Sequence, residues 1–161
     1  MKNFNSILFI IFTFLIAMIL SILPLPTWAT WFRPAWVVLV LMYWAIALPY
    51  QIGIGWAFGL GLALDILGGS VLGQHGLALC TVAYIGIKLH KQIRMYSFWQ
   101  QSAAIFFIVM LYQFLIALVQ GILGQAFSIY SFWMPAITSG LLWPWIFILL
   151  RDFRQRYVAL T

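Results

Sequence analysis

Acidic residues are nearly absent from this chain of 161 residues, which holds two aspartates and no glutamate. Charged residues make up only 6% of it, whereas a soluble domain carries roughly 25%. So few charged side chains cannot cover a globule in water. The single cysteine, Cys80, excludes a disulfide framework, a CxxC redox pair and a cysteine-based zinc site. Because hydrophobic residues make up 66%, we expect one domain, residues 1–161, whose surface faces lipid.

Apolar segments of helical length follow one another along the chain. In lipid every backbone N–H and C=O must be paired within the protein, so such runs predict helices, and no alternation typical of transmembrane strands occurs. Prolines and glycines separate the runs. Several runs are shorter than the roughly 20 residues that cross a bilayer. We predict an all-α membrane protein with six transmembrane helices, over residues 6–23, 35–48, 52–67, 71–87, 102–123 and 132–150.

The basic residues are distributed unevenly among the connections. An excess of Lys and Arg in short loops marks the cytoplasmic side. With six spans, Arg33 lies alone on one side, and all other basic residues share the opposite side: Lys2, Lys88, Lys91, Arg94, Arg151, Arg154 and Arg156. Merging the second and third spans would destroy this asymmetry. We therefore predict cytoplasmic N- and C-termini.

The segment between the fourth and fifth spans carries Lys88, Lys91 and Arg94 three residues apart. A helix there would present one basic face to the cytoplasm, with neighbouring apolar residues in the interface. One interpretation is ordinary topological charge, and the other is a platform for an acidic lipid or a cytoplasmic protein. Both interpretations also apply to the arginines of the C-terminal tail, Arg151, Arg154 and Arg156.

Asp65 is the only acidic residue within an expected span, which makes it a candidate for function with a partner to be named. In an antiparallel hairpin that turns near Tyr50, Arg33 and Asp65 reach similar heights near the outer face. We therefore predict an ion pair between Arg33 and Asp65 that joins the second and third helices. The alternatives are that Asp65 caps the segment after Gly69 or meets water. A proton relay would need a second titratable group at similar depth.

Small residues recur at helical spacing in the third span, where Gly55 precedes Gly59 and Ala57 precedes Gly61 by four positions. This spacing lets helix backbones approach closely. We predict that the glycines Gly55, Gly59 and Gly61 form a packing face, with the lining of a ligand site as the alternative.

The fifth span carries a polar and small stripe, Gln113, Ala117, Gln120 and Gly124, on an otherwise apolar helix. Because such a stripe is unfavourable in lipid, it should face protein. The spacing leaves two partners open, a neighbouring helix of this chain or the helix of another protein.

Signatures of enzymes are missing. His75 and His90 lie on opposite sides of the six-span arrangement, and neither belongs to an HExxH motif. No P-loop or dinucleotide fingerprint occurs, and GGSVLG at Gly68 to Gly73 lacks a glycine two positions after Ser70, as a nucleophile elbow requires. We predict no catalytic residue, no cofactor and no metal. The distribution of basic residues at segment ends argues against nucleic acid.

Three blocks of the sequence carry a resemblance to a known family. They are LMYWAIALP at Leu41 to Pro49, GLGLALDILGGSVLG at Gly59 to Gly73, and LLWPWIFILLR at Leu141 to Arg151. Together they resemble the rod shape-determining protein MreD over nearly the whole chain.

The resemblance implies a non-enzymatic scaffold in the cytoplasmic membrane, within the complex that elongates the cell wall of rod-shaped bacteria. It implies the partners MreC, MreB, RodA and a class B penicillin-binding transpeptidase. It also implies a fold similar to the six-helix S component of energy-coupling-factor transporters. The first helix departs from those transporters, because it offers only Ala17 and Ser21 where they carry paired alanines. The alternative function is a transport subunit that binds a small molecule or a lipid.

Overall fold

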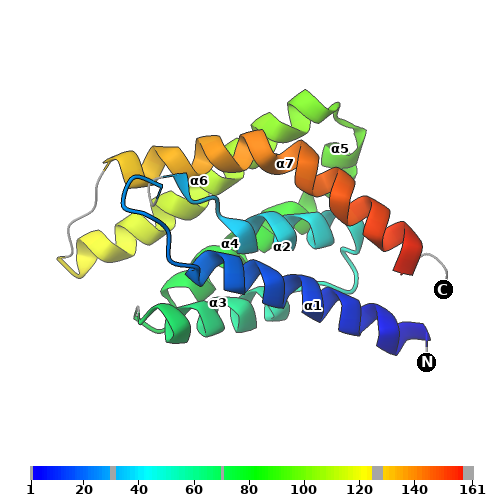
Figure 1. Ribbon diagram of the computed structural model, residues 1–161, viewed down its shortest axis with the longest axis horizontal. Coiled ribbons are helices and arrows are strands. Elements are labelled where there is room, and N and C mark those ends of the chain that lie inside the picture. The colour runs from blue at the N-terminus through cyan, green and yellow to red at the C-terminus, as the bar shows by residue number, and fades with distance from the viewer. Residues whose placement is uncertain (1, 30–31, 70, 125–128, 158–161) are drawn as a thin grey trace.

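The computed structural model describes residues 2–29, 32–69, 71–124 and 129–157. Their regular structure consists of α-helices, which confirms the all-helical prediction for this part of the chain. The helices are α1 (Lys2–Ile22), α2 (Trp36–Ala47), α3 (Ile54–Gly68), α4 (Gln74–Lys88), α5 (His90–Met95), α6 (Phe98–Ile122) and α7 (Ile129–Tyr157) (Figure 1). Each expected span corresponds to one of the longer helices. The short α5 lies in the basic segment that joins the fourth and fifth spans.

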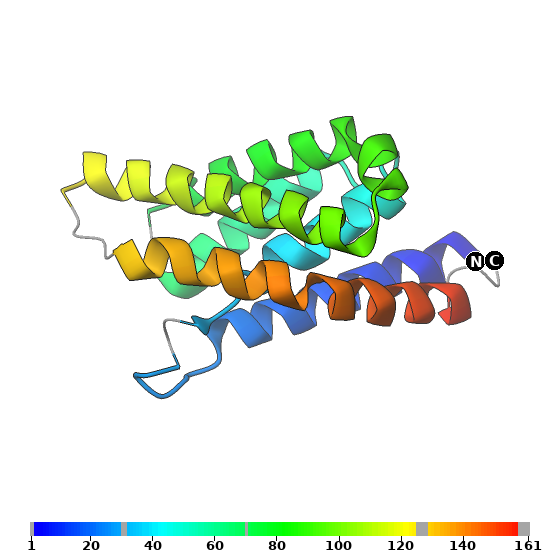
Figure 2. The same ribbon diagram turned by 90° about the horizontal axis from the view of Figure 1, so that it is seen from above.

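The longer helices run in alternate directions through the molecule. In Figures 1 and 2, α1, α3 and α6 run one way, and α2, α4 and α7 run the other way. The start of α1 and the end of α7 therefore lie at the same end of the molecule, together with α5 (Figure 2). We call this the basic end, because it carries α5 and the arginines of α7. The opposite end holds the α1–α2 connection and is called the Arg33 end.

Helix α2 forms the centre of the bundle. Every side chain from Val37 to Ile46 is buried, and α1, α4, α5 and α7 all contact this helix. A helix that is apolar on every side is expected to be enclosed by protein. Its 12 residues span about 18 Å, less than the roughly 30 Å of a bilayer core. Because protein surrounds α2, little of its backbone faces lipid, even though the helix is shorter than the bilayer core.

One buried polar contact fixes α2 against α1. The indole Nε1 of Trp44, which is fully buried, donates a hydrogen bond of 3.0 Å to the hydroxyl of Thr13. That hydroxyl in turn donates to the carbonyl of Ile10 at 2.7 Å. Both polar groups are therefore paired, as burial in an apolar environment requires.

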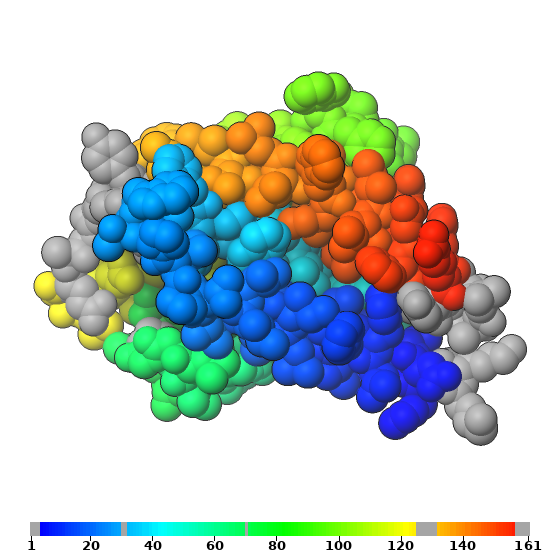
Figure 3. Space-filling model, viewed as in Figure 1, coloured from blue at the N-terminus to red at the C-terminus, as the bar shows by residue number. Residues whose placement is uncertain are grey.

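The outer helices carry the apolar surface. Within the described part of the chain, three helical stretches are long and apolar enough to cross a membrane: Phe4–Ile22, Phe98–Ile122 and Phe132–Arg156. Large hydrophobic side chains on them are exposed, including Phe12, Phe107 and Trp145. Helices α1 and α7 form much of one face of the molecule (Figure 3). An apolar surface of this extent is stable against lipid rather than against water.

Candidate functional site

A buried carboxylate lies at the Arg33 end, between α3 and α4. Asp65 is 1% exposed. Its Oδ2 accepts a hydrogen bond from the backbone N–H of Gly73 at 2.8 Å. Its Oδ1 accepts from the backbone N–H of His75 at 3.1 Å and lies 2.6 Å from the Nδ1 of the same residue. Asp65 thus caps the start of α4 and orients the His75 ring.

Arg33 lies in the connection between α1 and α2. Its guanidinium donates hydrogen bonds to the carbonyl of Ser21, at 2.6 Å, and to the carbonyl of Leu23. These carbonyls belong to the last turn of α1 and the residue after it, where helical carbonyls lack an intrahelical partner and a cation is favourable. Arg33 therefore closes the C-terminal end of α1.

The structure does not bring Arg33 and Asp65 together in the predicted ion pair. The contacts described for Arg33 are with the end of α1, whereas those of Asp65 are with the start of α4. The alternative in which Asp65 caps the segment after Gly69 agrees with this geometry. The partner of Asp65 is His75, which was not predicted from the sequence. His75 is also a second titratable group beside Asp65.

The predicted glycine face of α3 is divided between two environments. A Cβ atom on Gly61 would lie 2.2 Å from the Cα of Gly76 in α4, so the two backbones are in direct contact there. A Cβ atom on Gly55 or Gly59 would meet no atom within 4 Å. Gly61 is therefore a packing residue, while Gly55 and Gly59 lie on the open side of α3.

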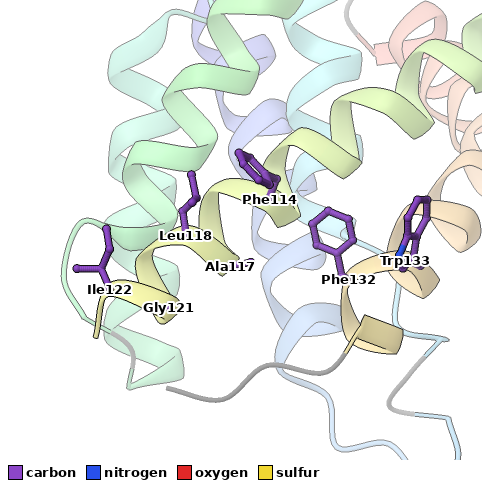
Figure 4. A pocket seen from close by; sticks show the side chains of 7 residues that line it. All are labelled: Phe114, Ala117, Leu118, Gly121, Ile122, Phe132 and Trp133. Atoms are coloured by element: carbon purple, nitrogen blue, oxygen red, sulfur yellow. The ribbon is translucent and has the colours of Figure 1, made fainter. Parts of the chain in front are cut away.

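A groove runs between the last turns of α6 and the start of α7, and we call it the α6–α7 groove. Its volume is about 700 Å³. Figure 4 shows Phe114, Leu118 and Ile122 projecting from α6, with Phe132 and Trp133 opposite on α7. Ala117 and Gly121 complete the lining. Gly121 follows Ala117 by four positions, and a Cβ on Gly121 would meet nothing within 4 Å. We call Ala117 and Gly121 the floor of the groove. Because both residues are small, another helix can approach closely there.

The predicted stripe on α6 is dispersed by the fold. Gln113 lines a cavity at the Arg33 end, and Ala117 lines the α6–α7 groove. Gln120 is half-buried. Gly124 lies beyond the helix with φ +74° and donates its N–H to the carbonyl of Gly121 at 3.1 Å, so it ends α6 rather than packing it.

Helix α5 is fastened to the bundle at the basic end. Arg94 Nε donates to the carbonyl of Ile46 at 2.9 Å, and Nη2 donates to that of Ala47 at 2.9 Å. Arg94 thus closes the C-terminal end of α2, a structural task that the sequence analysis did not assign to it. Buried Gln101 donates to the carbonyl of Ile93 at 3.0 Å and accepts from Trp143 Nε1 at 3.3 Å.

The other basic residues remain close to aromatic rings or project outward. Lys88 Nζ lies 5.8 Å from the centre of the Tyr84 ring. Arg154 lies 6.0 Å from the ring of Tyr43, and Arg151 lies 5.9 Å from the ring of Phe147. Lys91 and Arg156 are exposed. The residues predicted to form a cytoplasmic basic surface thus gather at one end of the molecule, with Arg94 committed to α2.

Nothing in the described geometry assembles a metal centre. Among the residues that the structure describes, no three His, Cys, Asp or Glu side chains come together as ligands. The Asp65 and His75 pair has a structural task at the start of α4. The polar contacts described above position helices and side chains. The surfaces of the molecule are the features that a partner would bind.

The sequence matches one family model, described as rod shape-determining protein MreD, over residues 1–153. The chain belongs to the MreD family. The MreD match includes every helix of the fold up to the last turns of α7. A curated relative, the rod shape-determining protein MreD of Haemophilus influenzae, is 43% identical over 143 residues, which cover 89% of this chain and 88% of that protein. No solved structure matches the chain at a significant level.

Membership of the MreD family confirms the resemblance that the three sequence blocks carry. Two of these blocks contain features of the fold: Gly59 to Gly73 includes Gly61 and Asp65, and Leu41 to Pro49 lies largely in the central α2. The third block, Leu141 to Arg151, belongs to the apolar part of α7. The MreD family and the apolar helices together identify a membrane protein concerned with rod shape.

The residues of the α6–α7 groove were only partly foreseen. The stripe predicted on the fifth span is centred on the polar side chains Gln113 and Gln120 and does not include Gly121. A signal was present, because Ala117 and Gly121 have the small-xxx-small spacing that also predicted a packing face in the third span. Trp133 and Phe132 lie on another helix and could not be joined to these residues without the fold.

Proposed function

We propose that this protein is a non-enzymatic scaffold of the cell-wall elongation complex in the bacterial inner membrane. The observation that carries the proposal is the family match over residues 1–153, because the family and the relative from Haemophilus influenzae are both described as rod shape-determining. Its partners are MreC and, through the same complex, MreB, RodA and the class B penicillin-binding transpeptidase. No residue of the described part has an arrangement that would need a cofactor.

The proposed topology has six crossings, with the basic end in the cytoplasm. The alternate directions of the longer helices support it, as does the concentration of basic residues at the end where α1 starts and α7 finishes (Figures 1 and 2). Positive residues are favoured on the cytoplasmic side. The fold that this arrangement suggests is similar to the S component of energy-coupling-factor transporters, in which six helices also cross the membrane.

The α6–α7 groove is the proposed docking site for the single transmembrane helix of MreC. Its walls are apolar and open to lipid, with Ile122 84% exposed and Phe114 49% exposed. Apolar burial gives little net attraction in lipid, so helix association depends on close packing. The floor at Ala117 and Gly121 permits that packing, whereas the large side chains on either side would contact the flanks of the entering helix.

A leucine at position 121 tests the docking site. The Gly121→Leu side chain would occupy the floor, and its Cβ would not clash with the fold because a Cβ there meets no atom within 4 Å. We expect about tenfold less MreC to be captured with the variant, because overpacking of a close contact costs about 1–3 kcal/mol and each 1.4 kcal/mol is tenfold in affinity. The measurement is quantitative capture of MreC by affinity-tagged protein in cells depleted of the native chain, with cell shape scored in parallel.

Two further leucines make the result specific. Ala103→Leu introduces an exposed side chain on α6 outside the groove and should capture MreC normally. Gly59→Leu blocks the open side of α3, which is the competing face. Loss of MreC with Gly59→Leu but not with Gly121→Leu would move the docking site to α3. Normal rods and normal capture with Gly121→Leu would contradict the groove assignment.

A further inference from the structure

A second hollow lies at the Arg33 end, enclosed by several helices, and we call it the Arg33 cavity. Its volume is about 440 Å³, within the roughly 300–1,000 Å³ of small-molecule sites. The lining comes from α1, the α1–α2 connection, α2, α3, α4, α6 and α7. Apolar walls are contributed by residues such as Leu64 and Ile116, while the polar side chains that line it include Arg33, His75, Tyr112 and Gln113.

Among the residues that the structure describes, no carboxylate forms an ion pair with Arg33. The chain has two acidic residues. Asp65 bonds to Gly73 and His75, and Asp152 lies near the end of α7, at the basic end. Arg33 bonds instead to two backbone carbonyls, and its buried Nε has no hydrogen-bond partner. A cation beside apolar walls is costly unless an anion or further hydrogen bonds compensate it.

Other groups beside the cavity can complete an anion site. His75 also lines the cavity, and its ring is oriented there by the contact of Nδ1 with Asp65. The His75 ring centre lies 6.3 Å from that of Tyr112, a residue only 6% exposed. Gln113 supplies an amide from the next position of α6. A guanidinium, a hydroxyl and an amide are all hydrogen-bond donors.

We propose that the Arg33 cavity binds an oxyanion, a phosphate or a carboxylate, carried by a lipid headgroup or a small soluble molecule. The guanidinium of Arg33, which lines the cavity, attracts the oxyanion, since a guanidinium is a cation whose planar shape fits phosphate and carboxylate groups. Tyr112 and Gln113 donate from α6, and the apolar walls contact the remainder of the molecule. This site is separate from the α6–α7 groove and does not depend on the scaffold function.

Native mass spectrometry of the full chain in detergent tests the site. Phosphatidylglycerol is added as the lipid probe and phosphatidylcholine as the neutral-headgroup comparison, and inorganic phosphate is added alone in a parallel thermal-unfolding measurement. We expect preferential retention of phosphatidylglycerol, or a higher Tm with phosphate. The first result identifies a lipid headgroup and the second a free oxyanion. If neither probe binds preferentially or stabilises the protein, the proposal is overturned.

Variants locate the binding at the cavity. Arg33→Gln should reduce binding of the effective probe about tenfold or more, because it removes a charge-assisted hydrogen bond. Gly68→Leu keeps the charge and obstructs the lining of the cavity. It should also reduce binding while folding normally, since a Cβ at Gly68 meets no atom within 4 Å.

Lys91→Gln removes one charge at the basic end. It measures how much probe binding falls when any one cation is missing. The loss with Arg33→Gln and Gly68→Leu must exceed it. Equal losses in all three variants, or undiminished binding in Gly68→Leu, would refute a site in this cavity.

Discussion

The Gly61→Leu substitution should lower the free energy of unfolding by about 3 kcal/mol or more. Overpacking of a close contact costs about 1–3 kcal/mol and occasionally more. The atoms that a new Cβ would meet are backbone atoms, with the Cα of Gly76 at 2.2 Å and its N at 2.3 Å. A backbone cannot change rotamer to make room. Helix α4 would have to move away from α3, which would disturb Asp65 and His75 at the next turn.

The measurement is thermal unfolding of the purified protein in detergent, with Gly59→Leu as the matched control. Gly59 lies on the same helix, two positions away, and a Cβ there meets no atom within 4 Å. The control should therefore change stability by no more than about 0.5 kcal/mol. Equal stability of the two variants would show that α3 and α4 are not in backbone contact at Gly61.

The Asp65→Ala substitution should lower the free energy of unfolding by about 3–5 kcal/mol. This is the range found when one partner of a buried charged contact is removed. The substitution leaves the backbone N–H groups of Gly73 and His75 without the carboxylate that accepts from them. It also removes a negative charge from the N-terminal end of α4, where the helix dipole favours one. The loss of several bonds to one buried side chain explains the large expected effect.

Thermal unfolding with two comparisons isolates the cause. Asp152→Ala removes the chain's other carboxylate, which is exposed, and should change stability little. Combining Asp65→Ala with His75→Ala in a double-mutant cycle should give a coupling energy of about 1–3 kcal/mol. A coupling energy near zero, or equal effects of the two aspartate substitutions, would refute the cap at the start of α4.

The longer helices could be predicted from the sequence because apolar runs and their proline and glycine boundaries determine them locally. Pro24 follows the end of α1, and Pro49 follows the end of α2. The break between α5 and α6 was less accessible, since α5 has only six residues. A signal was nevertheless present. Ser97 and Gln100 form a capping box at the start of α6, a pattern that is recognisable in sequence.

The contacts between helices could not be predicted as well. The pair of Asp65 with Arg33 was predicted from their similar heights in an antiparallel hairpin, but the carboxylate accepts hydrogen bonds from the start of α4 instead. Arg94 was assigned to a basic surface, although the unpaired carbonyls at the end of α2 are available to it. In both cases a helix end supplied the partner, and the sequence does not reveal which helix end lies nearby.

The central claim is that the longer helices cross the membrane with the basic end inside, and labelling of single cysteines in intact cells tests it most directly. In a Cys80→Ser background, cysteines replace Thr27 and Leu72 at the Arg33 end, and Gln92 and Gln155 at the basic end. A membrane-impermeant maleimide should label the first pair in intact cells and the second pair only after permeabilisation. Labelling of the Gln92→Cys variant from outside, or of the Gln92→Cys and Gln155→Cys variants from opposite sides, would contradict the account.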